Sequence, residues 1–296
     1  MNLRRRIKRF RYLAEYQIVR LAFWLFMRLK PQTASNVGSK IARFVGKRIS
    51  VNKLAYDNMS KAIPTLTHSK KLQIVDDMWD NLGRIVGEFG HIAKFGVKEA
   101  EDYYEISKET EENIKQMAES KTGGIMVGAH IGNWEIGPKV FMKHGLDVSA
   151  VYRPLNNPYV EKLTTSSRVA KMISKSTKGS RQILQEIKKG GYVVILADQK
   201  VSEGEPVKFF HDDAITTTSI ARIALKYDVP IIPSRSIRIG KEFKFIVEIK
   251  KPIDFTKSSD IDADVIDLTR KINVQLEDWI KQHPSQWFWV HNRWKR

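Results

Sequence analysis

The sequence predicts an α/β fold: a mostly parallel sheet flanked by helices, with a helical, membrane-associating extension at the N-terminus. From residue 121 onward, short apolar runs of strand length alternate with amphipathic stretches of helical period. This alternation is typical of a parallel sheet with crossover helices. The 296 residues are enough to bury a core, and they contain neither an internal repeat nor a convincing linker. We therefore expect a basic membrane-anchoring segment over 1–30 and one domain over 31–296.

The first hundred residues are expected to be helical. Apolar residues recur with helical spacing over 34–48, 51–63 and 68–95. Pro64 is expected to break the chain between the last two of these helices, and Thr67 or Ser69 is placed to cap the last one.

The remainder is expected to supply the sheet. Four apolar runs, beginning at residues 123, 146, 192 and 229, predict strands over GGIMVGA, LDVSAVYR, YVVILADQ and VPIIPSRSIR. Helices are expected over NWEIGPKVFMKHG, over roughly 157–175, over SRQILQEIKKGG, which its glycines end, and over TTTSIARIALKYD. The segment KEFKFIVEIKKPIDF is expected to be an antiparallel strand at the sheet edge, before a last helix over 261–282.

The charge balance restricts the class of partner. The chain has 51 Lys and Arg against 33 Asp and Glu, a formal net charge of +18. Such an excess favours nucleic acid, an anionic membrane surface, or an acidic carrier or substrate. The sequence contains no cysteine, which excludes disulfides, thiolate metal sites and a cysteine nucleophile and favours a cytoplasmic location.

The N-terminal segment has the composition of a helix at a membrane surface. The basic stretch MNLRRRIKRFR is followed by the aromatic-rich stretch YLAEYQIVRLAFWLFMR. Because Glu15 and Arg20 interrupt it, the apolar part is shorter than the roughly 20 residues that a spanning helix needs. We expect an interfacial helix with Trp24, Tyr12 and Tyr16 at the headgroups. A short tilted span and a helix packed on the domain are the two alternatives.

Polar residues follow three of the expected strands. His130 follows the first strand, Arg153 ends the second, and Asp198 and Gln199 end the third. The carboxyl ends of parallel strands meet at one edge of a sheet, where ligands bind. We therefore expect these side chains to form a catalytic cleft.

His130 and Glu135 are spaced as a general base and its helper. An imidazole can take a proton from a hydroxyl when a second group fixes its tautomer and stabilises the imidazolium. If a helix begins at Gly132 and Asn133, Glu135 lies in its first turn, where the helix dipole keeps a carboxylate ionised. Such a dyad would activate an alcohol supplied by the substrate. The alternative is a turn histidine beside a glutamate that only stabilises the helix N-terminus.

The segment GAHIGNWEIG over 128–137 resembles the His-four-residues-acid motif of the lysophospholipid acyltransferase superfamily. The chain is most similar to the late acyltransferases of lipid A biosynthesis. The similarity extends over NMSKAIP, NLGRIVGE, VYRPLNNP, ADQK, VKFFHDDAITTTSIARIA and the closing HPSQWFWVHNRWK. The sequence departs from the family pattern at His211 and Ser219, where glycine is usual, and at Asn292, where arginine is usual. These departures bear on acceptor or acyl-length preference.

The resemblance implies transfer of a fatty acyl chain, of lauroyl type, from acyl-carrier protein to a hydroxyl of a Kdo-lipid IVA-like lipid A precursor. His130 and Glu135 would be the catalytic dyad. Arg153 would stabilise the developing oxyanion or bind a phosphate, with a salt bridge to Asp198 as its structural alternative. The residues expected to bind the acceptor or shape its site are Arg153, Asp198, Asn133, Gln199 and Asn156.

We expect no cofactor and no metal, because the sequence has neither a metal-ligand cluster nor a phosphate-binding glycine loop. The expected partners are acyl-carrier protein, the lipid A precursor and the anionic inner membrane, at its cytoplasmic face. The closing Trp287, Trp289 and Trp294 lie among cations, which suits a membrane interface or single-stranded nucleic acid. The resemblance favours the membrane and no nucleic acid. The two alternative functions are an acyltransferase for another glycolipid, such as a phosphatidylinositol mannoside, and a basic nucleic-acid-binding protein.

Overall fold

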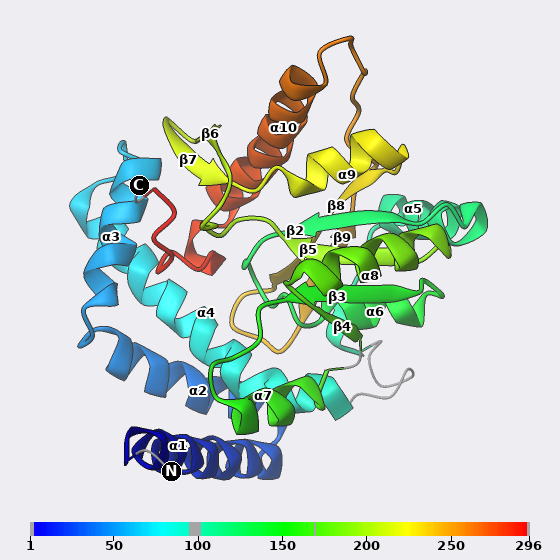
Figure 1. Cartoon of the computed structure of the whole chain (residues 1–296). Coiled ribbons are helices and arrows are strands. Elements are labelled where there is room, and N and C mark those ends of the chain that lie inside the picture. Colours follow the sequence, from blue (N-terminus) through cyan, green and yellow to red (C-terminus); the bar gives the residue numbers. More distant parts are fainter. Residues whose placement is uncertain (1–2, 95–101, 169, 295–296) are drawn as a thin grey trace.

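The computed structural model describes residues 3–94, 102–168 and 170–294, and it shows the predicted α/β fold (Figure 1). A seven-stranded sheet has the order β1-β9-β8-β2-β5-β3-β4. Every neighbouring pair of strands is parallel except β8 and β9, so the prediction of a mostly parallel sheet is confirmed. The strands are β1 (Tyr104–Glu105), β2 (Gly124–Gly128), β3 (Val148–Tyr152), β4 (Lys171–Ser174), β5 (Tyr192–Leu196), β8 (Ile231–Arg238) and β9 (Phe245–Ile249).

Helices make up the N-terminal third and cover both faces of the sheet. The N-terminal helices are α1 (Leu3–Arg28), α2 (Pro31–Gly46), α3 (Val51–Ala62) and α4 (His68–Lys94). The others are α5 (Lys108–Ser120), α6 (Gly137–Lys143), α7 (Pro158–Thr165), α8 (Thr177–Lys188), α9 (Ser219–Tyr227) and α10 (Ile261–Gln282), which the 3₁₀ turn η2 (Pro284–Gln286) follows. The hydroxyl of Thr67 accepts a hydrogen bond from the backbone N–H of Lys70, so Thr67 caps α4 as predicted.

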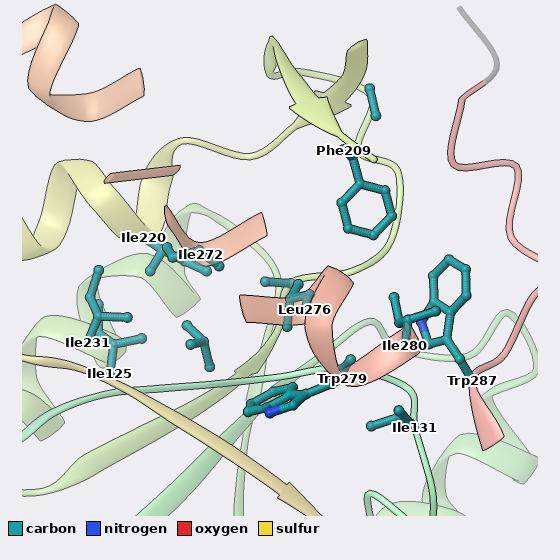
Figure 2. Close-up of a cluster of buried hydrophobic side chains, with 14 of the residues drawn as sticks. Ile125, Ile131, Phe209, Ile220, Ile231, Ile272, Leu276, Trp279, Ile280 and Trp287 are labelled. Carbon is teal, nitrogen blue, oxygen red and sulfur yellow. The ribbon is translucent and has the colours of Figure 1, made fainter. Parts of the chain in front are cut away.

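The central strands are buried on both faces. Along β2, Ile125 and Val127 join one apolar cluster, with residues of α8, α9 and α10, whereas Met126 joins a second cluster, with residues of α5 and α6. Because successive side chains of a strand point to opposite faces, this division places helices on both sides of the sheet. Figure 2 shows the first cluster, in which Trp279 and Ile280 of α10 lie near Ile131. This packing fixes the carboxyl end of β2, where His130 follows.

Three local expectations are wrong. The region expected to be one helix over roughly 157–175 forms the short α7 and then the strand β4. The β9 strand is antiparallel to β8 as expected, but β1 pairs with its other side, so β9 is not at the edge. The helix expected from residue 133 begins at Gly137 instead, which leaves 131–136 as a turn. A separate antiparallel hairpin, β6 (Glu205–Phe209) with β7 (Asp212–Thr216), had not been predicted.

The N-terminal helix α1 lies against the domain on one side and exposes apolar residues on the other. The Phe23 ring packs on Phe89 of α4, with centroids 5.7 Å apart. Tyr16 lies against Tyr159 of α7, with ring centroids 6.0 Å apart, whereas Trp24 is about half exposed. In the part of the chain that the structure describes, no helix combines the length and the apolar character that crossing a membrane requires. The alternative of a helix packed on the domain is therefore confirmed for one face of α1.

Candidate active site

His130 and Asp198 meet because β2 and β5 are parallel neighbours. The register pairs Gly128 with Leu196, so the residues two positions beyond each strand come together at the carboxyl edge of the sheet. The Asp198 carboxylate accepts a hydrogen bond from the backbone N–H of His130 at 2.9 Å, and the Nδ1 atom of the His130 ring lies 2.8 Å from Asp198 Oδ1. An ionised carboxylate is only an acceptor, so Nδ1 carries the proton and Nε2 presents the lone pair of a base.

Asp198 is held as a buried anion. Its side chain is fully buried, and Oδ2 also accepts a hydrogen bond from the indole N–H of Trp287 at 2.7 Å. Burial by itself raises the pKa of Asp198, but the His130 imidazole and its hydrogen bonds outweigh that effect and hold the pKa below its usual range. The carboxylate is thus ionised at neutral pH and can stabilise an imidazolium beside it.

The C-terminal segment closes one side of this site. It pairs with the turn after β2: Gly132 N donates to Gln286 O at 3.1 Å, and Phe288 N donates to His130 O at 3.0 Å. Gly132 has a φ of +59°, and a Cβ at this position would overlap the carbonyl oxygen of Ser236. Only glycine therefore allows the turn to pack here.

The expectation that the closing tryptophans contact a membrane or nucleic acid is wrong for two of them. Trp287 and Trp289 are both 0% exposed, with ring centroids 4.5 Å apart. Trp287 donates to Asp198, and Trp289 donates to the carbonyl oxygen of Pro284 at 2.6 Å. These rings support the site from inside, where neither bases nor lipids reach them.

Gln199 and His291 complete the polar groups around His130. The amide nitrogen of Gln199 lies 3.0 Å from Nε2 of His130 and 2.8 Å from Nε2 of His291. Burial lowers the pKa of His291 to about 4; the negative charge of Asp198 opposes this shift, and the neighbouring His130 and Arg293 add to it. His291 is therefore neutral at pH 7. His291 was not among the residues expected at the site.

Glu135 does not contact His130 in the described residues, which corrects the expected dyad geometry. Its carboxylate accepts two hydrogen bonds from the Arg168 guanidinium, at 3.0 Å from Nε and 2.6 Å from Nη2. The prediction assumed that Glu135 lies in the first turn of a helix, but residues 131–136 form a turn ahead of α6. The His130 ring instead makes an edge-to-face contact with Trp134, with centroids 5.0 Å apart.

Asn133 supports the turn rather than an acceptor site. It is fully buried, and its Nδ2 donates to Glu88 Oε2 at 2.8 Å while its Oδ1 accepts from the backbone N–H of Glu135 at 3.2 Å. Glu88 in turn pairs with Arg238, which is also buried. A buried ion pair is stable only when its remaining hydrogen bonds are made, and Asn133 makes one of them. Its side-chain atoms are thus not available to a substrate.

Arg153 and Asn156 are exposed and lie at the carboxyl edge beyond β3. The strand order places β5 between β2 and β3, so these residues lie about two strand spacings, roughly 10 Å, along the edge from His130. No salt bridge joins Arg153 to Asp198 within the described ranges, so the structural alternative for Arg153 is not found. Burial lowers the pKa of the neighbouring Lys175, and the positive charge of Arg153 lowers it further. This part of the edge therefore presents uncompensated positive charge.

His130, Asp198 and His291 also have the atom types of a metal site. Their potential ligand atoms all lie within 4.8 Å of one another, although the three residues are far apart in sequence. The Asp198 oxygens, however, already accept three N–H donors from His130 and Trp287. Three of the roughly four lone pairs of the carboxylate are thus taken, so Asp198 offers little to an ion and acts chiefly as the hydrogen-bond partner of His130.

The chain is similar to known proteins over nearly its whole length. Residues 4–296 match the family described as bacterial lipid A biosynthesis acyltransferase. The chain is 24% identical over 288 residues to the lipid A biosynthesis lauroyltransferase of Escherichia coli K12, a match that covers 94% of this chain and 88% of the relative. It is 20% identical over 265 residues to the myristoyltransferase of the same organism, covering 88% and 80%. It is also 24% identical over 293 residues to a lipid A biosynthesis acyltransferase of Haemophilus influenzae Rd, covering 94% and 85%. The chain therefore belongs to the bacterial lipid A biosynthesis acyltransferase family and is an O-acyltransferase.

Proposed function

We propose that this enzyme transfers a fatty acyl chain, of lauroyl type, from acyl-carrier protein to a hydroxyl group of a Kdo-lipid IVA-like lipid A precursor. The observation that carries the proposal is the imidazole of His130, whose Nδ1 is bound to the buried, ionised Asp198 and whose side chain is 18% exposed. A neutral imidazole held in this way is the general base that acyl transfer to an alcohol requires. The family relationship supports a fatty acyl group and an acceptor of the lipid A type.

The proposed reaction uses the two nitrogens of His130 for different tasks. Nε2 takes the proton of the acceptor hydroxyl. At the same time the hydroxyl oxygen forms a bond to the carbonyl carbon of the thioester. The tetrahedral intermediate then expels the thiolate by breaking the carbon–sulfur bond, and the imidazolium returns the proton to the sulfur. Nδ1 remains bound to Asp198, which stabilises the cation between these steps. Asp198 thus takes the helper role that the sequence assigned to Glu135.

Other polar groups are proposed to bind the acceptor. The phosphates of a lipid A precursor are anionic, and Arg153 and Lys175 follow neighbouring strands that are paired in register, Tyr152 with Ser174. A guanidinium can bind a phosphate through two hydrogen bonds, and an ammonium adds a point charge. Asn156 is exposed on the loop that follows and could donate a hydrogen bond to the sugar or phosphate.

We further propose that α1 binds the cytoplasmic face of the anionic inner membrane. Large apolar side chains that are each more than half exposed gather on this helix: Ile7, Phe10, Ile18, Leu21, Trp24 and Leu25. Cations lie among them, and the guanidinium of Arg28 lies 4.9 Å from the Trp24 ring centroid. Apolar and aromatic side chains interleaved with cations are typical of interfacial helices, which bind by apolar burial and by attraction to anionic lipid.

An acyl-transfer assay tests the proposed reaction. The purified protein would be incubated with lauroyl-acyl-carrier protein and, in parallel, with a Kdo-lipid IVA-type acceptor or a phosphatidylinositol mannoside. Lauroyl-coenzyme A in place of the carrier protein tests the donor. We expect one added acyl chain on the lipid A precursor, detected by mass spectrometry, and faster transfer from the carrier protein. Acylation of the mannoside alone would overturn the proposal.

Vesicle flotation tests the membrane surface. We expect binding to vesicles that contain anionic phospholipid and weaker binding to purely zwitterionic vesicles. The variant Phe10→Ser should weaken binding. The matched control is Ile261→Ser, which changes another exposed apolar residue, 67% exposed against 76% for Phe10. Ile261 is the first residue of α10, a helix on the far side of the molecule from α1 (Figure 1). Equal binding by the two variants would exclude α1 as the membrane contact.

A further inference from the structure

The side chain of Asn157 joins the N-terminal helix α1 to the start of α7. It is buried, with 7% of its surface exposed. Its Oδ1 atom accepts hydrogen bonds from the backbone N–H groups of Tyr159 and Val160, at 3.1 and 3.4 Å, and so caps α7. Its Nδ2 atom donates to the carbonyl oxygen of Tyr12 at 2.8 Å and to Glu15 Oε2 at 3.0 Å, both on α1. The amide thus uses its oxygen on one helix and both of its N–H donors on the other.

These contacts fix how α1 lies against α7, beside which it runs (Figure 1). One hydrogen bond goes to the backbone of α1 and the other to a side chain three positions further on, on the same face of the helix. Together they set both the position of α1 along its axis and its rotation. Tyr16 adds an aromatic contact with Tyr159, with ring centroids 6.0 Å apart.

Asn157 also ends the acceptor loop, a name that we give to residues 153–157 between β3 and α7. Residues 153–156 are exposed, whereas Asn157 is buried. A second tether is the backbone N–H of Leu155, which donates to Oε2 of Glu161, on α7, at 2.8 Å. Segments with few buried contacts open at a low cost in free energy, so the order of this loop depends on such tethers.

We propose that Asn157 is a positioning residue for the acceptor: it holds the acceptor loop against α1, so that the seating of α1 sets where Arg153 and Asn156 lie. This inference rests on the proposed function, because it takes the acceptor to bind at those two residues. Groups that bind a substrate are effective only when the contacts behind them hold their geometry. The helix that is proposed to lie on the membrane thereby also shapes the loop that binds a lipid from that membrane.

The alternative is that Asn157 is only the N-cap of α7, and Asn157→Asp separates the two roles. An aspartate keeps the oxygen that caps α7 and is among the preferred N-cap residues. It has no N–H to donate, and its charge repels the carboxylate of Glu15. Combining it with Glu15→Gln restores part of the contact, because the new amide can donate to the new carboxylate. Glu15→Gln alone should change little, since it keeps an oxygen that accepts from Asn157.

Hydrogen exchange tests the coupling without any need for activity. Exchange in the full-length protein would be followed by peptide mass spectrometry. Asn157→Asp should accelerate exchange by a factor of about three to ten both in α1 around Tyr12 and in the acceptor loop, whose reporter is the N–H of Leu155. Exchange in α7 should stay at the wild-type rate, because the cap is kept. The double variant with Glu15→Gln should slow exchange in the acceptor loop again.

Asn36→Asp is the matched control. It adds the same charge at an exposed position of α2, where the side-chain oxygen of Asn36 accepts from Gln32 and Arg84, a role that an aspartate keeps. The acceptor loop should then exchange at the wild-type rate. Three results with Asn157→Asp would overturn the proposal: unchanged exchange throughout, faster exchange in α1 with an unchanged acceptor loop, or faster exchange in α7 as well.

Kinetics test the effect on the acceptor. The Kdo-lipid IVA-type acceptor would be supplied in detergent micelles, so that binding to a bilayer plays no part. The KM of Asn157→Asp for the acceptor should rise by a factor of about three to ten, because the lost hydrogen bonds order the loop that binds it. Its kcat and its KM for lauroyl-acyl-carrier protein should stay within about twofold of the wild type, because the His130–Asp198 bond is untouched. The double variant with Glu15→Gln should recover part of the acceptor KM.

The split between KM and kcat distinguishes positioning from a general structural role. A fall in kcat with an unchanged KM for the acceptor would overturn the proposal, as would a double variant with a KM no better than that of Asn157→Asp. If the wild-type protein transfers no acyl groups, the proposed function fails, whereas the exchange rates still decide whether α1 and the acceptor loop are coupled.

Discussion

The loop after β5 and the turn after β2 each carry a carboxylate that the sequence relates to His130, and the two are held in opposite ways. Asp198 is fully buried and accepts three N–H groups, one of them from the His130 ring. Glu135 is 14% exposed and is paired with Arg168, which is 25% exposed. Glu135, which is close to His130 in sequence, thus pairs with a guanidinium. Asp198, which is 68 positions away, is the partner of the imidazole. Strand register, rather than spacing along the chain, selects the partner of the imidazole.

The largest expected effect on acyl transfer comes from removing the imidazole of His130, the proposed base. His130→Ala should lower acyl transfer by about 10³- to 10⁴-fold, because general base catalysis is lost. The side chain lies at the edge of the site and is partly exposed, so the melting temperature should change by only a few degrees. A thermal unfolding curve and the transfer assay check both statements. The control is His68→Ala, at the exposed first residue of α4. Activity within tenfold of the wild type in His130→Ala would contradict the proposed mechanism.

Asp198→Asn tests the buried side of the comparison and should have the next largest effect. An asparagine can accept from only one side, so its NH₂ group opposes one of the three N–H donors that now meet the carboxylate. Acyl transfer should fall by about 10²- to 10³-fold, because the imidazolium loses its counter-charge and the tautomer is no longer fixed. The free energy of unfolding, measured by denaturant titration, should fall by about 2–4 kcal/mol. Transfer close to the wild-type rate would show that Asp198 is only structural.

Much of the fold could be predicted because it depends on local patterns. The apolar runs at 123, 146, 192 and 229 all became strands, since a strand buried on both faces leaves a continuous apolar signal. The short strand β4 (Lys171–Ser174) could not be predicted from the sequence. Its four residues, KMIS, include an exposed lysine and are too few to form an apolar run. The extra strand β1 is two residues long and depends on β9 as its template.

The sequence predicted which residues lie at the site, but it did not predict which of their side chains contact each other. His130, Asp198 and Gln199 were expected at one sheet edge, and they do lie together there, because parallel strands place their ends side by side. The partner of Glu135 could not be predicted. Arg168 lies in the irregular segment after α7, and no local sequence pattern relates that segment to the turn after β2. His291 was missed because the closing segment is brought to His130 by long-range pairing, such as that between Ile131 and Trp287, which are 156 positions apart in the sequence.

The buried region should also make stability depend on pH through His291. Its pKa is about 4 in the folded protein and about 6.5 when unfolded, so as pH falls below 6.5 the unfolded chain takes up the proton first. The free energy of unfolding should therefore fall by up to about 3 kcal/mol between pH 6.5 and pH 4. The groups that face His291 do not offset this: Asp198 stays ionised over that range, and Arg293 stays charged.

His291→Gln should flatten this dependence in denaturant titrations at pH 7, 6, 5 and 4. Part of the slope should remain, because burial also lowers the pKa of His283. His283→Gln is the matched control and should remove only that smaller part. An unchanged slope in His291→Gln would mean that the pKa of His291 is the same in the folded and the unfolded protein, and would contradict the burial argument.

The smallest effect is expected on the exposed side of the comparison. Glu135→Gln should lower acyl transfer by about tenfold or less, because it weakens the bidentate pair with Arg168 and leaves the His130–Asp198 bond intact. Arg168→Met should have an effect of similar size. Since the two residues act as one pair, the double variant should be no worse than the more damaging single variant.

This cycle decides between the two carboxylates as helpers of His130. If Glu135 moves to the imidazole when substrate binds, Glu135→Gln would reduce transfer as far as Asp198→Asn does, and its effect would add to that of Arg168→Met. Additive effects of this size would support the His130–Glu135 dyad that the sequence spacing predicts. Non-additive, roughly tenfold losses would instead assign Glu135 to holding the loop at Arg168, and would leave Asp198 as the sole counter-charge of the base.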